Sequence, residues 1–407
     1  MSAVVFVAPF LLETTLRFLD AVSSLPAVRT GLVSQDPVER LPAVLRRRLA
    51  GHRRIADGLD ARQIAHATAE LGRELGPVRR LLGTLEQLQV PLGEVRETLG
   101  IGGLGAETAR NFRDKARMKD VLAAAGVPCA RHARVESVEA ARQAVERIGL
   151  PVVLKPTDAA GAQGTFRIAN GEELERALAA SRPSRERPAV VEEFVVGREH
   201  SFDTVSIGGR AIWHSLSHYL PPPLEVVDNP WIQWCVLVPR EIDDPRYDDI
   251  SRIAARALEA LGMETGLSHM EWFRRPDGSV LISEVGARPP GAQITSLISY
   301  AHDVDFYAAW ARLVVCDEFA PPRRAFAAGC AYLRGQGEGE TIRGVRGIRR
   351  VLAELGPAVV EKKLPVPGTR HATGYEGDGY VIVRHPDTAV VERALSLIVS
   401  NVRVDLG

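Results

Sequence analysis

The sequence lacks a net charge, a long apolar run and a cysteine motif. Its 51 basic and 51 acidic residues cancel, so electrostatics does not favour nucleic acid or an anionic membrane as the main partner. No stretch of about 18 apolar residues occurs, and the start, MSAVVFVAPF, has neither the basic segment nor the cleavage site of a signal peptide. The four cysteines lie far apart without a C-x-x-C pair, which argues against zinc or redox chemistry and favours buried, reduced thiols. These absences predict a cytoplasmic protein.

Three common functional fingerprints are missing from the places where they would act. The first strand-to-helix turn, APFLLE, contains no glycine, so the G-x-G-x-x-G dinucleotide fingerprint is absent from this turn. Neither the P-loop pattern G-x-x-x-x-G-K-[ST] nor the nucleophile elbow G-x-S-x-G occurs. The sequence therefore disfavours a Rossmann dehydrogenase, a P-loop enzyme and a serine hydrolase of the α/β type.

Lysine is scarce, and its placement is uneven. Only five of the 51 basic residues are lysines, namely Lys115, Lys119, Lys155, Lys362 and Lys363. A chain that uses arginine almost everywhere keeps lysine by accident or where a compact, flexible ammonium serves better than a planar guanidinium. Three of the five fall between residues 115 and 155, which makes this region a candidate functional site.

The first hundred residues predict an α/β opening. Residues 4–9 have the pattern of a buried strand, residues 10–25 that of an amphipathic helix and residues 30–35 that of a second strand. Residues 36–99 are predicted to be largely helical, with their arginine runs on solvated helix faces. The glycine-rich stretch at 100–105 is then a flexible joint and the first boundary.

The next segment combines a helix, a lysine at a strand end and a loop of small residues. A helix is predicted up to Gly126. Further along, LPVVLKP is predicted to be a strand with Lys155 at its end. The loop DAAGAQG follows at 158–164. Such a loop can be a plain hairpin, but backbone N–H groups and an ammonium that face one space suit a polyphosphate. Lys115 and Lys119, one helical turn apart, would add charge there.

Three glutamates interrupt the next apolar strand. Residues 190–206 have the apolar density of a central strand but include Glu192, Glu193 and Glu199. On an exposed edge these side chains would simply be solvated. Alternatively, an edge strand offers unpaired backbone groups to a purine, while a carboxylate accepts hydrogen bonds from ribose hydroxyls.

Two glutamates are predicted to face each other across a hairpin. Apolar runs of strand length flank the tripeptide Pro-Asp-Gly at 276–278, and a two-residue Asp-Gly loop puts Glu271 opposite Glu284. Facing side chains lie roughly 5 Å apart, where two carboxylates repel by about 3 kcal/mol at an effective dielectric near 20. The pair is tolerable if one carboxyl is protonated, if each has a basic partner such as Arg288, or if a divalent cation such as Mg²⁺ lies between them.

The order of these features resembles the ATP-grasp superfamily over roughly residues 105–320. The matching motifs are Lys115, P-V-V-L-Lys155-P with its glycine loop, E-E-F-V-x-G-x-E at 192–199, Glu271, and E-V-G-A-R at 284–288. The resemblance implies an α/β fold with a three-part ATP-grasp architecture. The expected parts are an N-terminal α/β domain (1–104), an ATP-grasp domain (105–319, with a lid at about 130–193) and a small C-terminal α+β domain (320–407).

For ATP, the resemblance implies binding residues from several segments. The phosphates would be bound by Lys115, Lys155 and the loop around Gly161 and Gly164. The hinge that binds adenine would comprise Glu192, Glu193, Phe194 and Val195, and the ribose would be held by Glu199.

The resemblance also implies which residues bind the metal and which are catalytic. Glu271 and Glu284 would bind Mg²⁺, for which Mn²⁺ could substitute, and Lys155 and Arg288 would be catalytic. One residue departs from the superfamily pattern, because Gly286 replaces an asparagine that often acts as a further metal ligand.

The motif E-V-G-A-R-P-P-G and the end of the chain are similar to L-amino-acid ligases and related carboxylate-amine ligases. This similarity implies an ADP-forming ligase that joins a small-molecule carboxylate, such as an amino acid, to an amine through an acyl phosphate, and it is compatible with a homodimer. One alternative is a ligase that acts on formate or bicarbonate. Another is a nucleotide-binding regulator without turnover.

Aromatic and histidine residues mark candidate substrate contacts. Four of the five tryptophans lie between residues 213 and 272, where a proline-rich aromatic insertion could wall a pocket, although core packing explains most tryptophans. The candidates are Trp213, His214, Tyr219, His269, Arg288 and Gly291. His269, on the same strand face as Glu271, is either a packing residue or a base for the amine.

Overall fold

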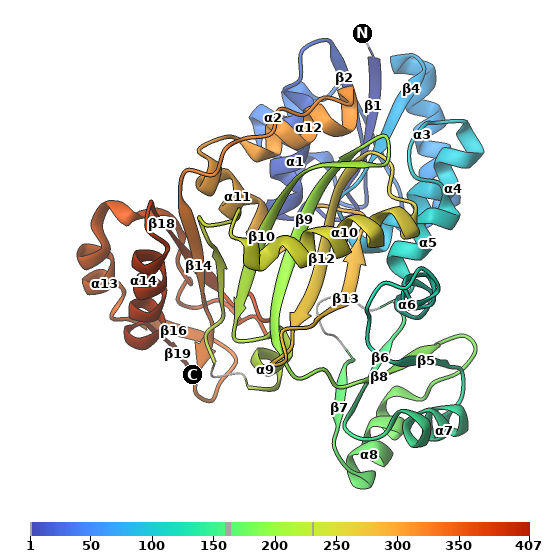
Figure 1. The fold of residues 1–407 in the computed structure, drawn as a ribbon. Coiled ribbons are helices and arrows are strands. Elements are labelled where there is room, and N and C mark those ends of the chain that lie inside the picture. The colour runs from blue at the N-terminus through green and yellow to red at the C-terminus, as the bar shows by residue number, and fades with distance from the viewer. Residues whose placement is uncertain (1, 159–163, 230–231) are drawn as a thin grey trace.

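The computed structural model describes residues 2–158, 164–229 and 232–407. In Figure 1 the N-terminal elements lie at the top, a small sheet with two helices lies at the lower right, and the C-terminal elements lie at the left. Within the described residues, no helix combines the length and the apolar character needed to cross a membrane. Gly161 lies outside the described residues. Gly164 has a φ of 66°, a left-handed conformation that favours glycine at this turn.

The first sheet is parallel, with β1 buried between two neighbours. Its strands are, in spatial order, β3 (Gly51–Arg54), β2 (Val28–Ser34), β1 (Ser2–Val7) and β4 (Val78–Leu82). The helices of this region are α1 (Glu13–Ser23), α2 (Ala43–Arg48), α3 (Ala61–Leu75) and α4 (Gln89–Leu99). The apolar run of β1 is almost completely buried, as expected for a strand covered on both faces.

Helices account for most of residues 36–99, as predicted, but two strands that the prediction missed, β3 and β4, also lie within them. Both strands are short and carry arginines, so no apolar alternation marks them. Arg53 on β3 is held by two glutamates of α3, an arrangement that only the folded chain creates. The arginine runs at 53–54 and 79–80 therefore lie on strands, and only the run at 46–48 lies on a helix.

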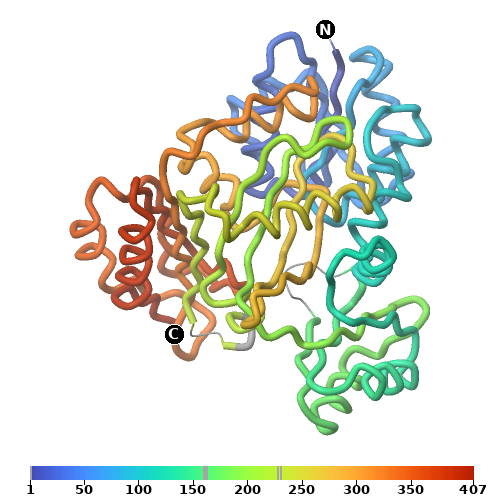
Figure 2. The backbone as a smooth tube through the Cα atoms, viewed as in Figure 1, coloured from blue at the N-terminus to red at the C-terminus, as the bar shows by residue number. Residues whose placement is uncertain are grey.

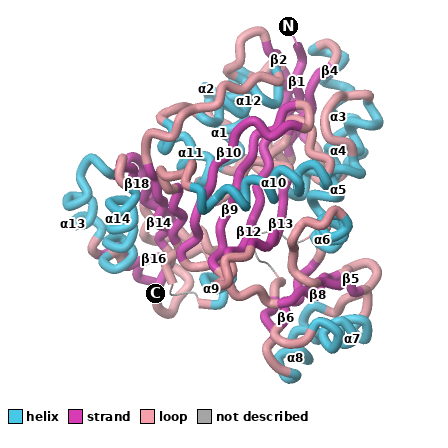
Figure 3. The backbone as a smooth tube through the Cα atoms, in the orientation of Figure 1, coloured by secondary structure: helices cyan, strands magenta, loops and turns pink. Residues whose placement is uncertain are grey.

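A second, four-stranded antiparallel sheet forms what we call the lid, residues 132–193. Its strands are, in spatial order, β5 (His132–Val135), β8 (Ala189–Glu193), β6 (Val152–Pro156) and β7 (Phe166–Ile168). Helices α7 (Val138–Ile148) and α8 (Gly171–Ser181) pack on it and enclose a separate apolar core (Figure 3). Because β8 pairs with both β5 and β6, the prediction of an edge strand was wrong.

The largest sheet has eight strands and runs through the middle of the molecule. They are, in spatial order, β13 (Val280–Gly286), β12 (Gly266–Arg274), β9 (Arg198–Ile207), β10 (Arg210–Leu220), β11 (Cys235–Val238), β14 (Ala327–Leu333), β18 (Gly379–His385) and β17 (Val359–Lys363). The associated helices are α9 (Pro223–Asp228), α10 (Asp248–Leu261), α11 (Ile294–His302) and α12 (Phe306–Cys316). One core contains α10, and the core on the opposite face contains α11 and α12 and joins them to α1.

The C-terminal segment continues this central sheet, because β14 pairs with β11 on one side and β18 on the other. The remaining elements are β15 (Gly335–Gln336), β19 (Arg403–Leu406) and β16 (Ile342–Arg346), which form a small sheet, and helices α13 (Ile348–Leu355) and α14 (Thr388–Asn401). The backbone trace in Figure 2 shows this segment in orange and red against the central strands. The predicted boundary at residues 319 and 320 therefore precedes strands that complete a shared sheet, and the three-domain division stays a prediction.

The helix predicted after the glycine-rich joint is divided. The two pieces are α5 (Ala106–Arg113) and α6 (Lys115–Ala124). The side chain of Asp114 accepts hydrogen bonds from two backbone N–H groups of α6, which is the usual way to start a helix. The N–H of Lys115 donates to the carbonyl of Thr157 at 2.9 Å. The division thus brings Lys115 next to the strand that carries Lys155.

The β12–β13 hairpin places Glu271 opposite Glu284, as predicted, but by a different route. The N–H of Arg275 donates to the carbonyl of Ser279 at 2.9 Å, so three residues form the loop instead of the predicted two. A β-bulge between Glu271 and Trp272 then shifts the register back by one residue. The two departures cancel at the glutamate pair.

Candidate active site

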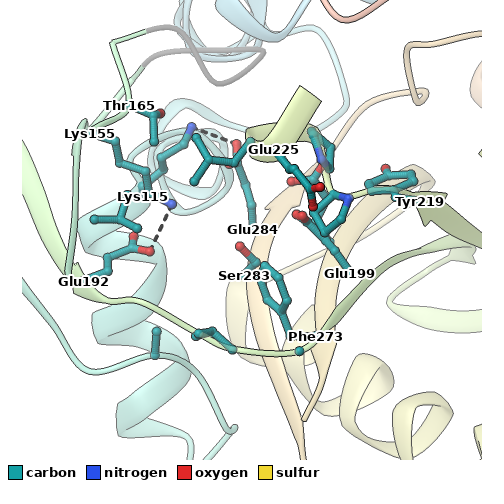
Figure 4. Close-up of a pocket in the computed structure, with 18 of the residues that line it drawn as sticks. Lys115, Lys155, Thr165, Glu192, Glu199, Tyr219, Glu225, Phe273, Ser283 and Glu284 are labelled. Atoms are coloured by element: carbon teal, nitrogen blue, oxygen red, sulfur yellow. Dashed lines mark hydrogen bonds and ion pairs between the residues drawn. The ribbon is translucent and has the colours of Figure 1, made fainter. Parts of the chain in front are cut away.

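A cavity of about 480 Å³ is lined by residues of the lid, the central sheet and the N- and C-terminal segments. We call the part around Lys119, Lys155 and Glu192 the lysine end. In Figure 4, Lys155 and Glu192 lie on one side of the view, and Glu199 and Tyr219 lie on the other. Residues that are far apart in the sequence therefore share one space.

Charges in the lysine end are paired. The Nζ of Lys155 lies 3.0 Å from Oε2 of Glu192, and the Nζ of Lys119 lies 3.5 Å from the same oxygen. Lys119 is fully buried and also donates to the backbone carbonyl of Ser283 at 2.8 Å. Burial opposes the charge of Glu192, but the two lysines outweigh it and lower the pKa of this carboxyl. The side chain of Glu192, predicted to be part of an adenine hinge, thus contacts two lysine side chains through one oxygen. Burial lowers the pKa of the second of them, Lys119.

Glu284 is paired with Lys115. From the first turn of α6, Lys115 donates through Nζ to Oε1 of Glu284 at 2.8 Å. Burial disfavours the charge of Glu284, but Lys115, Lys155 and Arg288 lower its pKa to about 2. Glu284 is therefore ionised at neutral pH. Its ion-pair partner is Lys115 and not Arg288, which was the basic partner considered from the sequence.

Glu271 lies beside a charged imidazole. The Nδ1 of His269 lies 2.7 Å from Oδ1 of the fully buried Asp203, and its Nε2 lies 3.8 Å from Oε1 of Glu271. Burial would lower the pKa of His269, but Asp203 and Glu271 raise it to about 9. A group that is protonated at neutral pH is a poor base, so this arrangement favours a positioning role for His269 over the role of a base. Both facing glutamates thus have a basic partner.

Glu199 on β9 lines the cavity and is 8% exposed. Burial and the charge of Glu271 raise its pKa well above the usual value. None of the ion pairs found among the described residues involves Glu199. The carboxyl is therefore available for hydrogen bonds with ligand hydroxyls, or for ionisation beside an added cation.

Arg288 connects the cavity to the N-terminal region. Its Nη2 donates to Oε2 of Glu86 at 2.7 Å, and the other oxygen of Glu86 accepts from Arg113 at 2.8 Å. Burial opposes the charge of Arg288, but Glu86 and Glu284 raise its pKa. The guanidinium is therefore held in place by an acid that follows β4, more than 200 residues earlier in the chain.

The predicted adenine hinge runs along the cavity, but part of its backbone is already paired. The N–H groups of Glu193 and Phe194 donate to the carbonyls of Arg131 and Pro151. The guanidinium of Arg167 lies over the ring of Phe194, 4.3 Å from the ring centroid. A purine would therefore have to use other backbone groups, and the following residue, Val195, also lines the cavity.

The structure separates the predicted substrate residues into two groups. Those that line the cavity are Tyr219, His269, Arg288 and Gly291. The predictions of Trp213 and His214 were wrong. Trp213 packs on Phe306 in the core with ring centroids 5.0 Å apart, and His214 stacks on Phe202 at 4.8 Å. The reason is the length of β10, since only its end at Tyr219 reaches the cavity.

Several cavity residues were missed by the sequence analysis. They are Glu86, Arg167, Glu225, Trp234 and Tyr375, and Lys119 was noted without a role. Glu86 had a signal, because it is an acid within the apolar stretch LLGTLEQLQV. Tyr375 had none, since it lies in an irregular loop of the C-terminal segment.

The residues present fit Mg²⁺ and ATP in charge and chemistry. Seven carboxylates line the described part of the cavity, against five lysine and arginine side chains and His269, so a bound polyphosphate needs added cations. In the described chain, no group of three or more metal-ligating side chains could hold an ion alone. Two carboxylates completed by phosphate oxygens and water are a usual arrangement for Mg²⁺. A Cβ at Gly286 would lie 3.4 Å from the side chain of Arg288, which fills the space beside this position.

Comparison with known proteins agrees with this geometry. Residues 120–299 match the family model described as the ATP-grasp domain. An L-arginine-specific L-amino acid ligase of Bacillus subtilis is 27% identical over 58% of this chain and 57% of its own length, so the chain spans little more than half of that relative. Among solved structures, an L-amino acid ligase from Bacillus licheniformis has a TM-score of 0.81 at 18% identity, covering 100% of this chain and 99% of its own. An N5-carboxyaminoimidazole ribonucleotide synthetase from Thermotoga maritima has a TM-score of 0.70 at 18% identity, covering 100% of both chains. At such identity the two structures establish a shared fold.

Proposed function

We propose, from the premise that this chain carries an ATP-grasp domain, that it is an ATP-dependent carboxylate-amine ligase. In the proposed reaction, ATP phosphorylates a carboxylate, an amine attacks the acyl phosphate, and an amide, ADP and inorganic phosphate result. The observation that carries the proposal is the convergence of Lys115, Lys155, Glu271, Glu284 and Arg288 on one cavity. Positive groups for a triphosphate and carboxylates for its cation would thus act in a single site.

ATP would bind along the lysine end. Lys155 and Lys115 would contact the phosphates, and Glu199 would bind the ribose hydroxyls. In this proposal Lys115 leaves Glu284 for a phosphate oxygen, which frees Glu284 to bind Mg²⁺ together with Glu271. When bound, Mg²⁺ would supply charge neutralisation for the phosphates. The existing ion pairs keep these side chains charged and positioned before the nucleotide arrives.

The chemistry would need positioning and charge more than a protein nucleophile. A substrate carboxylate oxygen attacks the γ-phosphorus, and the bond to the bridging oxygen of ADP breaks as the acyl phosphate forms. Arg288 stabilises the oxygens of the transferred group. The amine then attacks the acyl carbon, phosphate leaves with the electron pair of the C–O bond, and the amine proton passes to phosphate or water. His269, being protonated, contributes a fixed positive charge.

The test follows the fate of ATP. Each amide formed should release one ADP and one inorganic phosphate, and an oxygen-18 label in the substrate carboxylate should appear in the phosphate. Hydroxylamine should trap the acyl phosphate as a hydroxamate. Release of AMP and pyrophosphate would overturn the proposed mechanism, and ADP release that needs no carboxylate would favour an ATPase or a regulator.

Amino acids as substrates, a cytoplasmic location and a homodimer complete the proposal. All four cysteines are free thiols, which suits a reducing compartment. The prediction that they are buried holds for Cys235 and Cys330, but Cys129 is partly exposed and Cys316 is exposed at the end of α12. An exposed thiol of this kind persists most easily in the cytoplasm.

A further inference from the structure

We infer that the carboxylate substrate carries an apolar side chain, which three aromatic residues bind at the end of the cavity away from the lysines. These residues, which we call the aromatic corner, are Tyr219, Trp234 and Tyr375. The inference rests on the proposed ligase function and adds the class of substrate to it. Its support is the packing of the corner, its position and the charges around it.

The corner is assembled from three distant segments into one packed wall. The ring of Trp234 lies 5.4 Å from that of Tyr219 and 4.8 Å from that of Tyr375, both edge-to-face. Behind them, Tyr332 stacks on Trp234 at 4.9 Å. The indole N–H of Trp234 donates to the carbonyl of Pro221 at 3.1 Å. Trp234 is only 2% exposed. Because the protein already satisfies its indole N–H, the small part that a ligand could meet is apolar surface.

The corner adjoins the groups to which we assign the chemistry. The hydroxyl of Tyr219 lies 3.3 Å from Nε2 of His269, which is itself next to Glu271. Burial and Glu376 are the main causes that raise the pKa of Tyr375, and the charges of Glu271 and Arg288 also act on it. A carboxylate that reaches the γ-phosphoryl group between Glu271 and Arg288 would therefore place its side chain beside these rings.

The charges near the corner favour an apolar side chain over a charged one. Both oxygens of Glu86 are already bound, one to Arg113 and one to Arg288. A further acid on the cavity wall, Glu225 on α9, is exposed, so an ion pair with it would be screened and weak. A charged side chain placed against the rings would lose its hydration. The buried acids beside the rings, Glu199 and Glu271, are those that the proposed function assigns to the ribose and to Mg²⁺. Apolar atoms have no favourable hydration to lose there, and they gain contact with the aromatic surface.

The first experiment measures hydroxamate formation from a panel of amino acids, with hydroxylamine as the sole amine. Because hydroxylamine replaces the natural acceptor, the selectivity reports the carboxylate site alone. Leucine, methionine and phenylalanine should be used in preference to asparagine, glutamate and arginine. We expect kcat/KM for leucine to exceed that for the similarly sized asparagine by about 100-fold. Equal rates across the panel, or a preference for glutamate or arginine, would overturn the inference.

The second experiment removes one ring of the corner. Tyr375→Ala should lower kcat/KM for leucine and phenylalanine about tenfold or more, with little change for asparagine and for the KM of ATP, whereas Tyr375→Phe should keep the preference. Tyr300→Ala is the matched control, because Tyr300 is also a partly buried tyrosine but does not line the cavity. Thermal melts confirm that each variant folds. An equal loss for all substrates in Tyr375→Ala would contradict side-chain recognition by the corner.

Failure of the inference and failure of the ligase function give different results. A ligase with the wrong substrate class forms hydroxamates but prefers charged or polar side chains, or releases ADP only with formate or bicarbonate. A protein that is not a ligase of this type forms no hydroxamate and shows no carboxylate-dependent ADP release with any of these compounds. The wild-type panel separates the two outcomes without any variant.

Discussion

The lysine end and the aromatic corner belong to one cavity but are built in opposite ways. In the lysine end and beside it, buried charges are neutralised in pairs, Lys155 with Glu192 and Lys115 with Glu284. In the corner, three rings pack edge-to-face around Trp234. The two groups of a buried ion pair can both exchange partners without either being left unpaired when the ligand brings both signs of charge, as a phosphate with its cation does. Packed rings have no such exchange and respond instead to the shape and polarity of the ligand.

This difference assigns separate tasks to the two regions. The paired charges suit a ligand of high charge, whose phosphates and cation would replace partners that are already in place. The rings suit the part of a substrate that varies between related compounds. Changes in the lysine end should therefore affect turnover of every substrate, and changes in the corner should affect the choice among them.

The largest effect is expected at Glu284. We expect Glu284→Gln to lower kcat by about 1,000-fold, because a neutral amide cannot balance the cation that accompanies ATP. The variant should also melt at a lower temperature, since Lys115 is buried and loses an ion-pair partner. Glu271→Gln should lower kcat similarly but destabilise the fold less, because it weakens a longer contact, 3.8 Å to His269, and also removes the carboxylate charge that acts on Glu199. Steady-state ADP release and melting curves without nucleotide measure both quantities, and full activity of either variant would refute the metal assignment.

The next effect distinguishes lysines by location. Lys155→Ala should lower kcat/KM for ATP by about 100-fold, because an ammonium at the phosphates is lost. Lys363→Ala is the control, since Lys363 is exposed on β17 and pairs with Glu13 outside the cavity. Nucleotide titrations and ADP release compare the two variants. Equal losses would mean that the clustering of lysines in the sequence has no functional meaning.

A smaller effect is expected at Asp203, because its carboxylate keeps His269 protonated. This imidazole lies between the two regions. The pKa of His269 is about 9 in the folded protein, above its ordinary value of 6.5, so the protonated imidazole stabilises the folded state. This contribution to the free energy of unfolding is complete below pH 6.5 and is lost as the pH rises through 9. This difference corresponds to roughly 3 kcal/mol of unfolding free energy. In Asp203→Asn the pH dependence should be much flatter. Urea unfolding at several pH values measures it, with Asp303→Asn as a control on an exposed aspartate, and an unchanged pH dependence would contradict the charged imidazole.

The smallest effect is expected at His214. It lies on β10 with Tyr219 but stacks on Phe202, away from the cavity. His214→Gln should leave kcat/KM for ATP and for the preferred amino acid within about twofold of wild type, as for other positions that do not touch the site. A marked change in selectivity would show that the aromatic corner extends further along β10 than the structure indicates.

Much of the lysine end could be predicted from the sequence, because buried charge is unfavourable and therefore conspicuous in an apolar segment. Lys155 at a strand end, the acids at 192–199 and the facing glutamates were each visible in this way. The aromatic corner was not visible to the same degree. Tryptophans are common in cores, so Trp213 could not be distinguished from Trp234 until the end of β10 that reaches the cavity was known.

By itself, the sequence determined the α/β class and the order of the motifs that match the ATP-grasp family model, because strand patterns and charge placement are local properties. The sequence also predicted that Glu271 faces Glu284, but in the structure this pairing depends on a three-residue loop and a β-bulge that cancel. Only the tertiary structure decided which charged residues form ion pairs with each other. Lys115 and Glu284 are 169 residues apart, Arg288 and Glu86 are 202 apart, and the tyrosine that completes the aromatic corner comes from the far end of the chain. Such pairings depend on how helices and sheets dock, and the sequence pattern along one segment contains no information on the distance to another.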